Sequence, residues 1–153
     1  MNYLIRKATD DDATAISRVI VAALRESNRQ DYSAVIIAQV ELSFSPAAIL
    51  RLLAQRQVYV ATHGEDIIAT ASLDQATIRS VFVAPAHQGQ GAGRALMAAV
   101  ESAAAIHGVS QLRVPSSITA EGFYRLLGYS VIRDEYHGEE RTIIMEKSLT
   151  FPA

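Results

Sequence analysis

A short glycine-rich loop between an apolar strand and an apolar helix constrains the fold of this chain more than any other feature. In the stretch VFVAPAHQGQGAGRALMAAV, residues 81–100, three of the chain's eight glycines occupy positions 89, 91 and 93. Such a loop leaves backbone amides unpaired at the helix N-terminus, where the helix dipole favours negative charge. Glycine also lets an anion approach closely and opens torsions that other residues avoid. The pattern predicts a phosphate cradle, although a tight strand-to-helix turn alone would require similar glycines.

The hydrophobic periodicity around this loop predicts a mixed α and β domain. Apolar segments bounded by turn residues are typical of strands, and Ser45 followed by Pro46 is typical of a helix start. The stretch from Asn28 to Leu42 has partly helical spacing without a clear start or stop, and predicts a second helical or irregular segment. We expect strands at 3–9, 57–62, 67–73, 76–83, 111–115, 129–134 and 140–149, and helices at about 13–27, 45–55, 92–107 and 119–128.

Composition excludes several classes of protein. The chain of 153 residues has the length of one ordinary domain, and we expect a single domain over 1–153. It contains no cysteine, which removes disulfides and thiolate zinc sites and makes a cytoplasmic location the default. Its net charge of −2, with both signs interspersed, argues against nucleic acid as the main partner. No apolar run reaches membrane-spanning length, the four histidines lack metal-ligand spacing, and the start of the chain is unlike a signal peptide.

Two common phosphate-binding motifs do not fit the loop. A dinucleotide-binding fingerprint needs G-x-G-x-x-G in a parallel βαβ unit, whereas Gly89-Gln90-Gly91 is followed by Arg94 at the third glycine position. The strands before the loop also form a predicted antiparallel hairpin. A P-loop needs Gly-Lys-Ser/Thr at its end, and that ending is absent. Both motifs are therefore excluded.

The loop instead resembles the acyl-coenzyme A-binding segment of the GNAT superfamily of N-acetyltransferases, which reads Q/R-x-x-G-x-G/A. Here the matching residues are Gln88, Gly91 and Gly93. A later stretch, SSITAEGFYRLLGY, resembles a second segment of the family, A-S-x-x-A-x-x-F-Y-x-x-x-G-F/Y. Two motifs in the right order make the resemblance specific, while the residues up to about 57 resemble the family only in element order.

The resemblance implies an α+β fold: a mixed, mostly antiparallel sheet of about six or seven strands flanked by about four helices, with a splayed strand pair at the cofactor site. It implies that loop amides surround the coenzyme A pyrophosphate and that the pantetheine arm pairs with the backbone of the preceding strand. Pro115, which offers no N–H to a sheet ladder, fits the strand that would splay away. The residues implied for acetyl-coenzyme A are Val81, Phe82, Val83, Gln88, Gly89, Gln90, Gly91, Ala92, Gly93, Arg94 and Ser117.

Acyl transfer to an amine needs a proton for the departing thiolate and a base for the amine. Tyr124 occupies the family's tyrosine position, which implies a proton donor, although a packed core tyrosine is the alternative. The strand that often carries a glutamate in the family has Arg79 and Ser80 here, so we expect a water chain held by Ser80 or a carboxylate from elsewhere. The candidate carboxylates are Glu26, Glu41 and Asp74.

The sequence therefore predicts an acetyl-coenzyme A-dependent N-acetyltransferase that acts by direct transfer, releasing coenzyme A, with no metal. The acceptor is expected to be a small-molecule amine, bounded by the segments at about 25–45 and 130–145. Acidic residues at 26, 31 and 41 would suit a cationic amine. A catalytically silent acyl-coenzyme A sensor and a protein-amine acetyltransferase are the alternatives, and dimerisation is frequent in the family.

Overall fold

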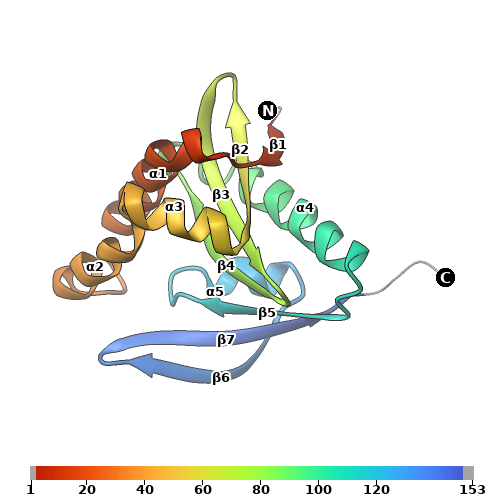
Figure 1. The fold of residues 1–153 in the computed structure, drawn as a ribbon. Coiled ribbons are helices and arrows are strands. Elements are labelled where there is room, and N and C mark those ends of the chain that lie inside the picture. The colour runs from red at the N-terminus through yellow and green to blue at the C-terminus, as the bar shows by residue number, and fades with distance from the viewer. Residues whose placement is uncertain (1–2, 150–153) are drawn as a thin grey trace.

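One open sheet of seven strands organises the molecule, in the order β1-β2-β3-β4-β5-β7-β6 (Figure 1). The structure is a computed structural model, and it describes residues 3–149. All neighbouring strands are antiparallel except β4 and β5. The strands are β1 (Leu4–Lys7), β2 (Gln57–His63), β3 (Asp66–Asp74), β4 (Thr77–Val83), β5 (Gln111–Ser116), β6 (Ser130–His137) and β7 (Glu140–Ser148). The α-helices are α1 (Ala13–Glu26), α2 (Ala34–Glu41), α3 (Pro46–Gln55), α4 (Ala92–Ile106) and α5 (Glu121–Leu126).

The helices pack on both faces of the sheet and bury two apolar clusters. On one face, α1 and α3 enclose Ile16, Ile20 and Ile49 against β2. On the other face, α4 lays Leu96 and Val100 against the sheet (Figure 1). Both Leu96 and Val100 are completely buried, so truncating Leu96 to alanine would cost about 2–5 kcal/mol of stability. Strand β4, the fourth of the seven strands in the sheet, lies between these two helical layers.

Strands β4 and β5 separate soon after they meet. Their only register pair is Thr77 with Arg113, whereas β5 pairs with β7 continuously from Gln111 to Ser116. The edge of β4 beyond Arg79 therefore has no strand beside it on this side. Pro115 lies in the diverging part of β5, where its missing N–H costs the sheet no bond toward β4. The splayed pair predicted from the sequence is present.

A bulge in β4 lies at the start of this free edge. Thr70 of β3 pairs with Phe82 and Ser72 pairs with Arg79, so one residue of β3 faces both Ser80 and Val81. Ser80 adopts a φ of 57°, a left-handed conformation uncommon for residues other than glycine. The bulge redirects the strand at the point where it leaves β5.

Serine side chains cap the starts of two helices, α2 and α3. Ser45 caps α3 by accepting a hydrogen bond from the Ala48 amide, with Pro46 at the first helical position. The segment 28–42, whose hydrophobic spacing has no clear start, contains α2, and the Ser33 hydroxyl caps this helix by accepting from the Ile36 amide. Helix α5 is shorter than the predicted 119–128, because a turn occupies the residues before Glu121.

Among residues 3–149, no single helix is long and apolar enough to cross a membrane. The pair Ala34–Phe44 and Pro46–Gln55, bent by 59°, meets the requirement only jointly and only in length and composition.

Candidate active site

Two adjoining cavities lie where β4 and β5 diverge. The first, of about 660 Å³, follows β4 to the glycine loop, and we call it the loop cavity. The second, of about 300 Å³, lies beneath α2, and we call it the α2 cavity. The two cavities share several lining residues, which we call the shared wall. A molecule bound in one cavity would therefore lie next to a molecule bound in the other. The shared residues are Asn28, Val81, Phe82, Ser117, Ala120 and Tyr124.

Two glycines of the loop are required by backbone conformation. Gly89 has a φ of 74° and Gly91, the N-cap of α4, has a φ of 94°, and both are left-handed. A Cβ at either position would meet no atom within 4 Å, so torsion and not space selects glycine there. The left-handed N-cap turns the chain into α4, whose first intrahelical bond joins the Ala95 amide to the Gly91 carbonyl at 3.0 Å. The preceding amides of the first turn stay unpaired within the helix.

Gly93 has a different role. It is buried, its φ is not left-handed, and a Cβ there would lie 3.2 Å from the Phe123 ring and 3.4 Å from the Val83 side chain. Its missing side chain lets α4 pack closely on Phe123, so the third glycine of the loop serves helix packing. The prediction that all three glycines form the phosphate cradle leaves this packing role out.

Some polar side chains of the loop make hydrogen bonds within the protein, and others face the loop cavity. Gln88 donates to the Ser27 hydroxyl at 2.7 Å and to the Val83 carbonyl at 3.2 Å, which ties the loop to the end of α1. The side-chain oxygen of Gln90 accepts from the Tyr3 hydroxyl at 3.0 Å, and Gln90 does not line the cavity. Arg94 is exposed on the first turn of α4 and does line it.

The groups that line the loop cavity suit an anionic ligand. The unpaired amides and the N-terminus of α4 face a cavity that also contains Arg94 and His87. The Nδ1 atom of His87 is buried and has no hydrogen-bond partner among the described residues. A buried polar atom without a partner costs free energy that a ligand acceptor or donor could recover. The loop cavity therefore suits phosphate groups.

Tyr124 stands in the shared wall of the two cavities. It is 4% exposed, and its ring packs edge-on against Phe123 and Tyr129. Burial raises the pKa of its phenol well above the usual value near 10, so the hydroxyl keeps its proton at neutral and mildly alkaline pH. Burial is the sole cause of that shift, unlike at Tyr129, whose hydroxyl donates to Glu101 at 2.7 Å. Tyr124 is thus both a core aromatic and a protonated group at the wall.

Ser80 and Ser117 each make a structural hydrogen bond at the site. Ser80 lines the α2 cavity, and its hydroxyl accepts from Arg56 at 3.3 Å. Ser117 lines both cavities, and its hydroxyl accepts from the Ala120 amide at 3.1 Å, as a cap of the turn before α5.

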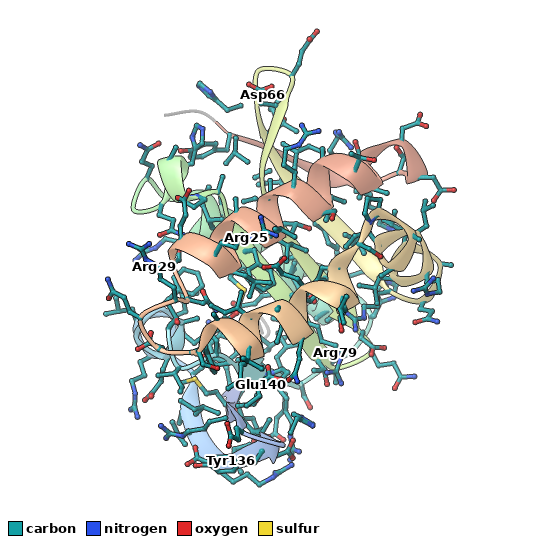
Figure 2. The ribbon with its side chains drawn as sticks, turned by 90° about the vertical axis from the view of Figure 1, so that its left-hand side faces the viewer. Arg25, Arg29, Asp66, Arg79, Tyr136 and Glu140 are labelled. Atoms are coloured by element: carbon teal, nitrogen blue, oxygen red, sulfur yellow. The ribbon has the colours of Figure 1, made fainter. Side chains whose placement is uncertain are left out.

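The α2 cavity is built from segments far apart in the sequence. Its walls include the segment 24–44 on one side and residues 137–142 on the other. Tyr32 joins them, because its hydroxyl donates to the Arg141 carbonyl and accepts from the Ile118 amide, both at 2.8 Å. Figure 2 shows α2 crossing this side of the molecule, with Arg79 and Glu140 labelled below it.

The carboxylates proposed as distant bases do not line either cavity. Glu41 pairs with Arg25 at 2.8 Å, Asp74 pairs with Arg79 at 3.3 Å, and Glu26 is exposed on α1. The proton acceptors that do line the α2 cavity are His137 and Glu140, from the β6–β7 hairpin. Neither residue is predicted from the sequence, because their position depends on how that hairpin folds back over β5. Asp31, also expected near the acceptor, instead accepts from Thr119 at 2.8 Å.

A family model described as an acetyltransferase (GNAT) domain matches residues 26–149. The chain belongs to this family. Membership agrees with the resemblance found in the sequence, and it makes this GNAT chain an acetyltransferase domain. It also supports acetyl-coenzyme A as the cosubstrate, in accord with the loop cavity. No curated protein has significant sequence similarity to it.

Solved structures of GNAT proteins match nearly the whole chain. A GCN5-related N-acetyltransferase from Rhodopseudomonas palustris has a TM-score of 0.91 at 25% identity, with 97% of each chain covered. The PaiA N-acetyltransferase from Thermoplasma acidophilum, solved with coenzyme A, has a TM-score of 0.84 at 18% identity, covering 97% of this chain and 100% of that one. The Escherichia coli ribosomal-protein-S18-alanine N-acetyltransferase has a TM-score of 0.69 at 19% identity, covering 99% and 97%. The α+β fold expected from the sequence is confirmed.

Proposed function

We propose that this GNAT protein transfers an acetyl group from acetyl-coenzyme A to the primary amine of a small molecule, by direct transfer within a ternary complex. The observation that carries the proposal is the wall shared by the two cavities. A molecule in the loop cavity and a second molecule in the α2 cavity would both contact Val81, Phe82 and Tyr124. Reactants held together in this way react as in a unimolecular step.

The loop cavity would hold the cosubstrate through main-chain groups. The unpaired amides of the Gly89–Arg94 segment and the start of α4 favour the pyrophosphate. The free edge of β4, from Val81 to Val83, offers main-chain groups with which an extended pantetheine arm can pair as an added strand, although the Val83 carbonyl already accepts from Gln88. Acetyl-coenzyme A supplies the acetyl group as a thioester.

Residues of the shared wall and of the α2 cavity would stabilise the developing charge and transfer protons. Tyr124, which keeps its proton near neutrality, would donate to the leaving sulfur. An amide at Val81 or Phe82 would stabilise the oxygen that gains charge. Glu140 and His137 line the α2 cavity and would accept the proton of a cationic amine. No cysteine is present to form an acyl-enzyme, which favours direct transfer.

The α2 cavity favours this function over the two alternatives. A silent sensor of acyl-coenzyme A needs only the loop cavity, and nothing in that role calls for a second cavity at the same wall. A cavity of about 300 Å³ matches a small molecule, which favours a free amine over a protein chain. The cytoplasmic location, the single-domain organisation and a homodimer stay predictions.

Two measurements on the purified protein test the proposal. Calorimetric titration with acetyl-coenzyme A should give a dissociation constant in the micromolar range. Thiol release from acetyl-coenzyme A should then depend on added amine, with initial velocities that intersect when both substrates are varied. Parallel velocity patterns would contradict direct transfer. Tight cofactor binding without turnover of any amine would support the sensor instead.

A further inference from the structure

The ionisable side chains of the α2 cavity give it an uneven charge. Two arginines, Arg56 and Arg79, line it together with Glu140 and His137. The acidic residues of the 25–45 segment do not line it: Glu26 is exposed, Glu41 is paired with Arg25, and Asp31 accepts from Thr119. A cationic acceptor without an anionic group would therefore meet two guanidinium groups.

Arg56 has no carboxylate partner. Its guanidinium donates only to the hydroxyls of Ser72, at 3.4 Å, and Ser80, at 3.3 Å. It takes part in none of the ion pairs formed within residues 3–149. Partial burial, and next the neighbouring charge of Arg79, lower its pKa. A partly buried charge without a counterion is costly, so an anion beside it would be bound favourably.

Arg79 adds a second set of donors. Its Nε atom lies 3.3 Å from a carboxylate oxygen of Asp74, and Asp74 itself does not line the cavity. This single contact leaves the other guanidinium donors of Arg79 for a ligand. Two neighbouring arginines are suited to a planar, bidentate anion such as a carboxylate.

The side of the cavity beneath α2 is apolar. Helix α2 and the turn after it contribute Ile36, Val40 and Phe44, and Phe44 stacks edge-on with Phe82 at a centroid distance of 5.7 Å. This surface would cover a hydrocarbon or aromatic group. The polar side chains line other parts of the cavity: Asn28, Tyr32, Ser80, Ser117 and Thr142.

We propose that the acceptor is an amino acid with an apolar side chain, whose carboxylate binds Arg56 and Arg79 while its amine faces Val81 and Tyr124. The inference rests on the proposed acetyl transfer and specifies its substrate class. The side chain of the amino acid packs on α2 and Phe44. The two arginines bind and orient the acceptor, and they take no part in the proton transfers.

The test uses three probes that share one hydrocarbon group: phenylalanine, phenylalaninamide and phenethylamine. Amine-dependent thiol release is measured for each, with the wild type and with Arg56→Gln. We expect the wild type to prefer phenylalanine over both other probes by about 10- to 100-fold in kcat/KM, the range of a charge-assisted hydrogen bond. The same series with leucine, leucinamide and isopentylamine repeats the comparison on an aliphatic group.

The arginine variants assign that preference to the cavity. Arg56→Gln should raise KM for phenylalanine by about tenfold or more and change phenethylamine by less than about threefold. The three amines differ in basicity, but this difference cancels when the ratio of kcat/KM between two probes is compared between the wild type and Arg56→Gln. Arg56→Lys, which keeps the charge and loses the planar fork, should retain part of the preference. Arg51→Gln, an exposed position on α3, is the matched control and should leave every ratio unchanged.

Two results would overturn the inference while leaving acetyl transfer in place. One is turnover of phenethylamine or the amide as efficient as that of phenylalanine. The other is a carboxylate preference that persists in Arg56→Gln and Arg79→Gln. If no probe of either series is turned over and calorimetry finds no binding of phenylalanine or leucine to the coenzyme A-loaded protein, the inference is also wrong. Failure of the wild type to bind acetyl-coenzyme A would refute the proposed function itself.

Discussion

The loop cavity and the α2 cavity share a wall but are made in different ways. Most of the loop cavity is formed by one continuous segment, from β4 through the glycine loop into α4, with the end of α1 and residues 117–124 completing its walls. The unpaired backbone amides of that segment do not depend on which side chains are present. The α2 cavity collects side chains from α1, α2, β4, β5 and the β6–β7 hairpin. Backbone-built sites suit a ligand common to a whole family, whereas side-chain-built sites can differ with every acceptor. The comparison explains why the cofactor could be predicted and the acceptor could not.

Among the substitutions, one in the shared wall of the two cavities should have the largest effect on the rate of acetyl transfer. Tyr124→Phe removes the proton donor and keeps the ring that packs on Phe123 and Tyr129. We expect kcat to fall by about 100-fold or more, with the affinity for acetyl-coenzyme A changed less than about threefold. Steady-state kinetics and calorimetry measure the two quantities. Tyr136→Phe, an exposed tyrosine on β6, is the control. An unchanged kcat would show that Tyr124 is only a core residue.

The next largest effect comes from replacing the glycines at the two ends of α4, which separates a loss of cofactor affinity from a loss of stability. Gly91 and Gly108 flank α4 with φ values of 94° and 82°, and a Cβ at either position meets nothing within 4 Å. Alanine at each should cost a similar 1–2 kcal/mol, roughly, of the free energy of unfolding. Only Gly91→Ala should weaken acetyl-coenzyme A binding, by about tenfold, because only it moves the cradle amides. Equal affinity in the two variants would place the cofactor elsewhere.

Replacing Glu140 should impair the use of the amine without changing the use of acetyl-coenzyme A. Glu140→Gln removes a proton acceptor from the α2 cavity, so kcat/KM for the amine should fall by about fivefold to tenfold below pH 8, where the amine carries a proton. The KM for acetyl-coenzyme A should stay constant. Glu139→Gln, the exposed neighbour, is the matched control. An equal loss in both variants would exclude Glu140 as the base.

The smallest effect is alkaline destabilisation. Burial raises the pKa of Tyr124 and Tyr129 above the value near 10 that they have in the unfolded chain. The folded state therefore holds these protons longer, and the stability linked to them is complete below pH 10 and is lost above it. Denaturant unfolding at pH 9 and pH 11 should show this fall, reduced in Tyr129→Phe. A free energy of unfolding that stays constant across this range would contradict the assigned shifts.

The parts predicted from sequence were those with local causes. The β4 strand, the left-handed Gly89 and Gly91, and the start of α3 at Ser45 follow from residues adjacent in the chain. The assignment of Gly93 to the cradle was incomplete, because its contact with Phe123 joins residues thirty positions apart in the sequence. Arg56 and Arg79 line the same cavity. This arrangement depends on the positions of α3, the β4 bulge and α2 together, and no sequence pattern encodes it.

The most direct test of the account follows individual backbone amides as acetyl-coenzyme A is added. The protein, at 16.6 kDa, is small enough for amide spectra by nuclear magnetic resonance with nitrogen-15 labelling. The account predicts large shifts for Gly89, Gly91 and Gly93 and for the free edge of β4, with Gly64, Gly108 and Gly138 unchanged. Shifts confined to residues outside the loop cavity, or no shifts in the folded protein, would contradict it.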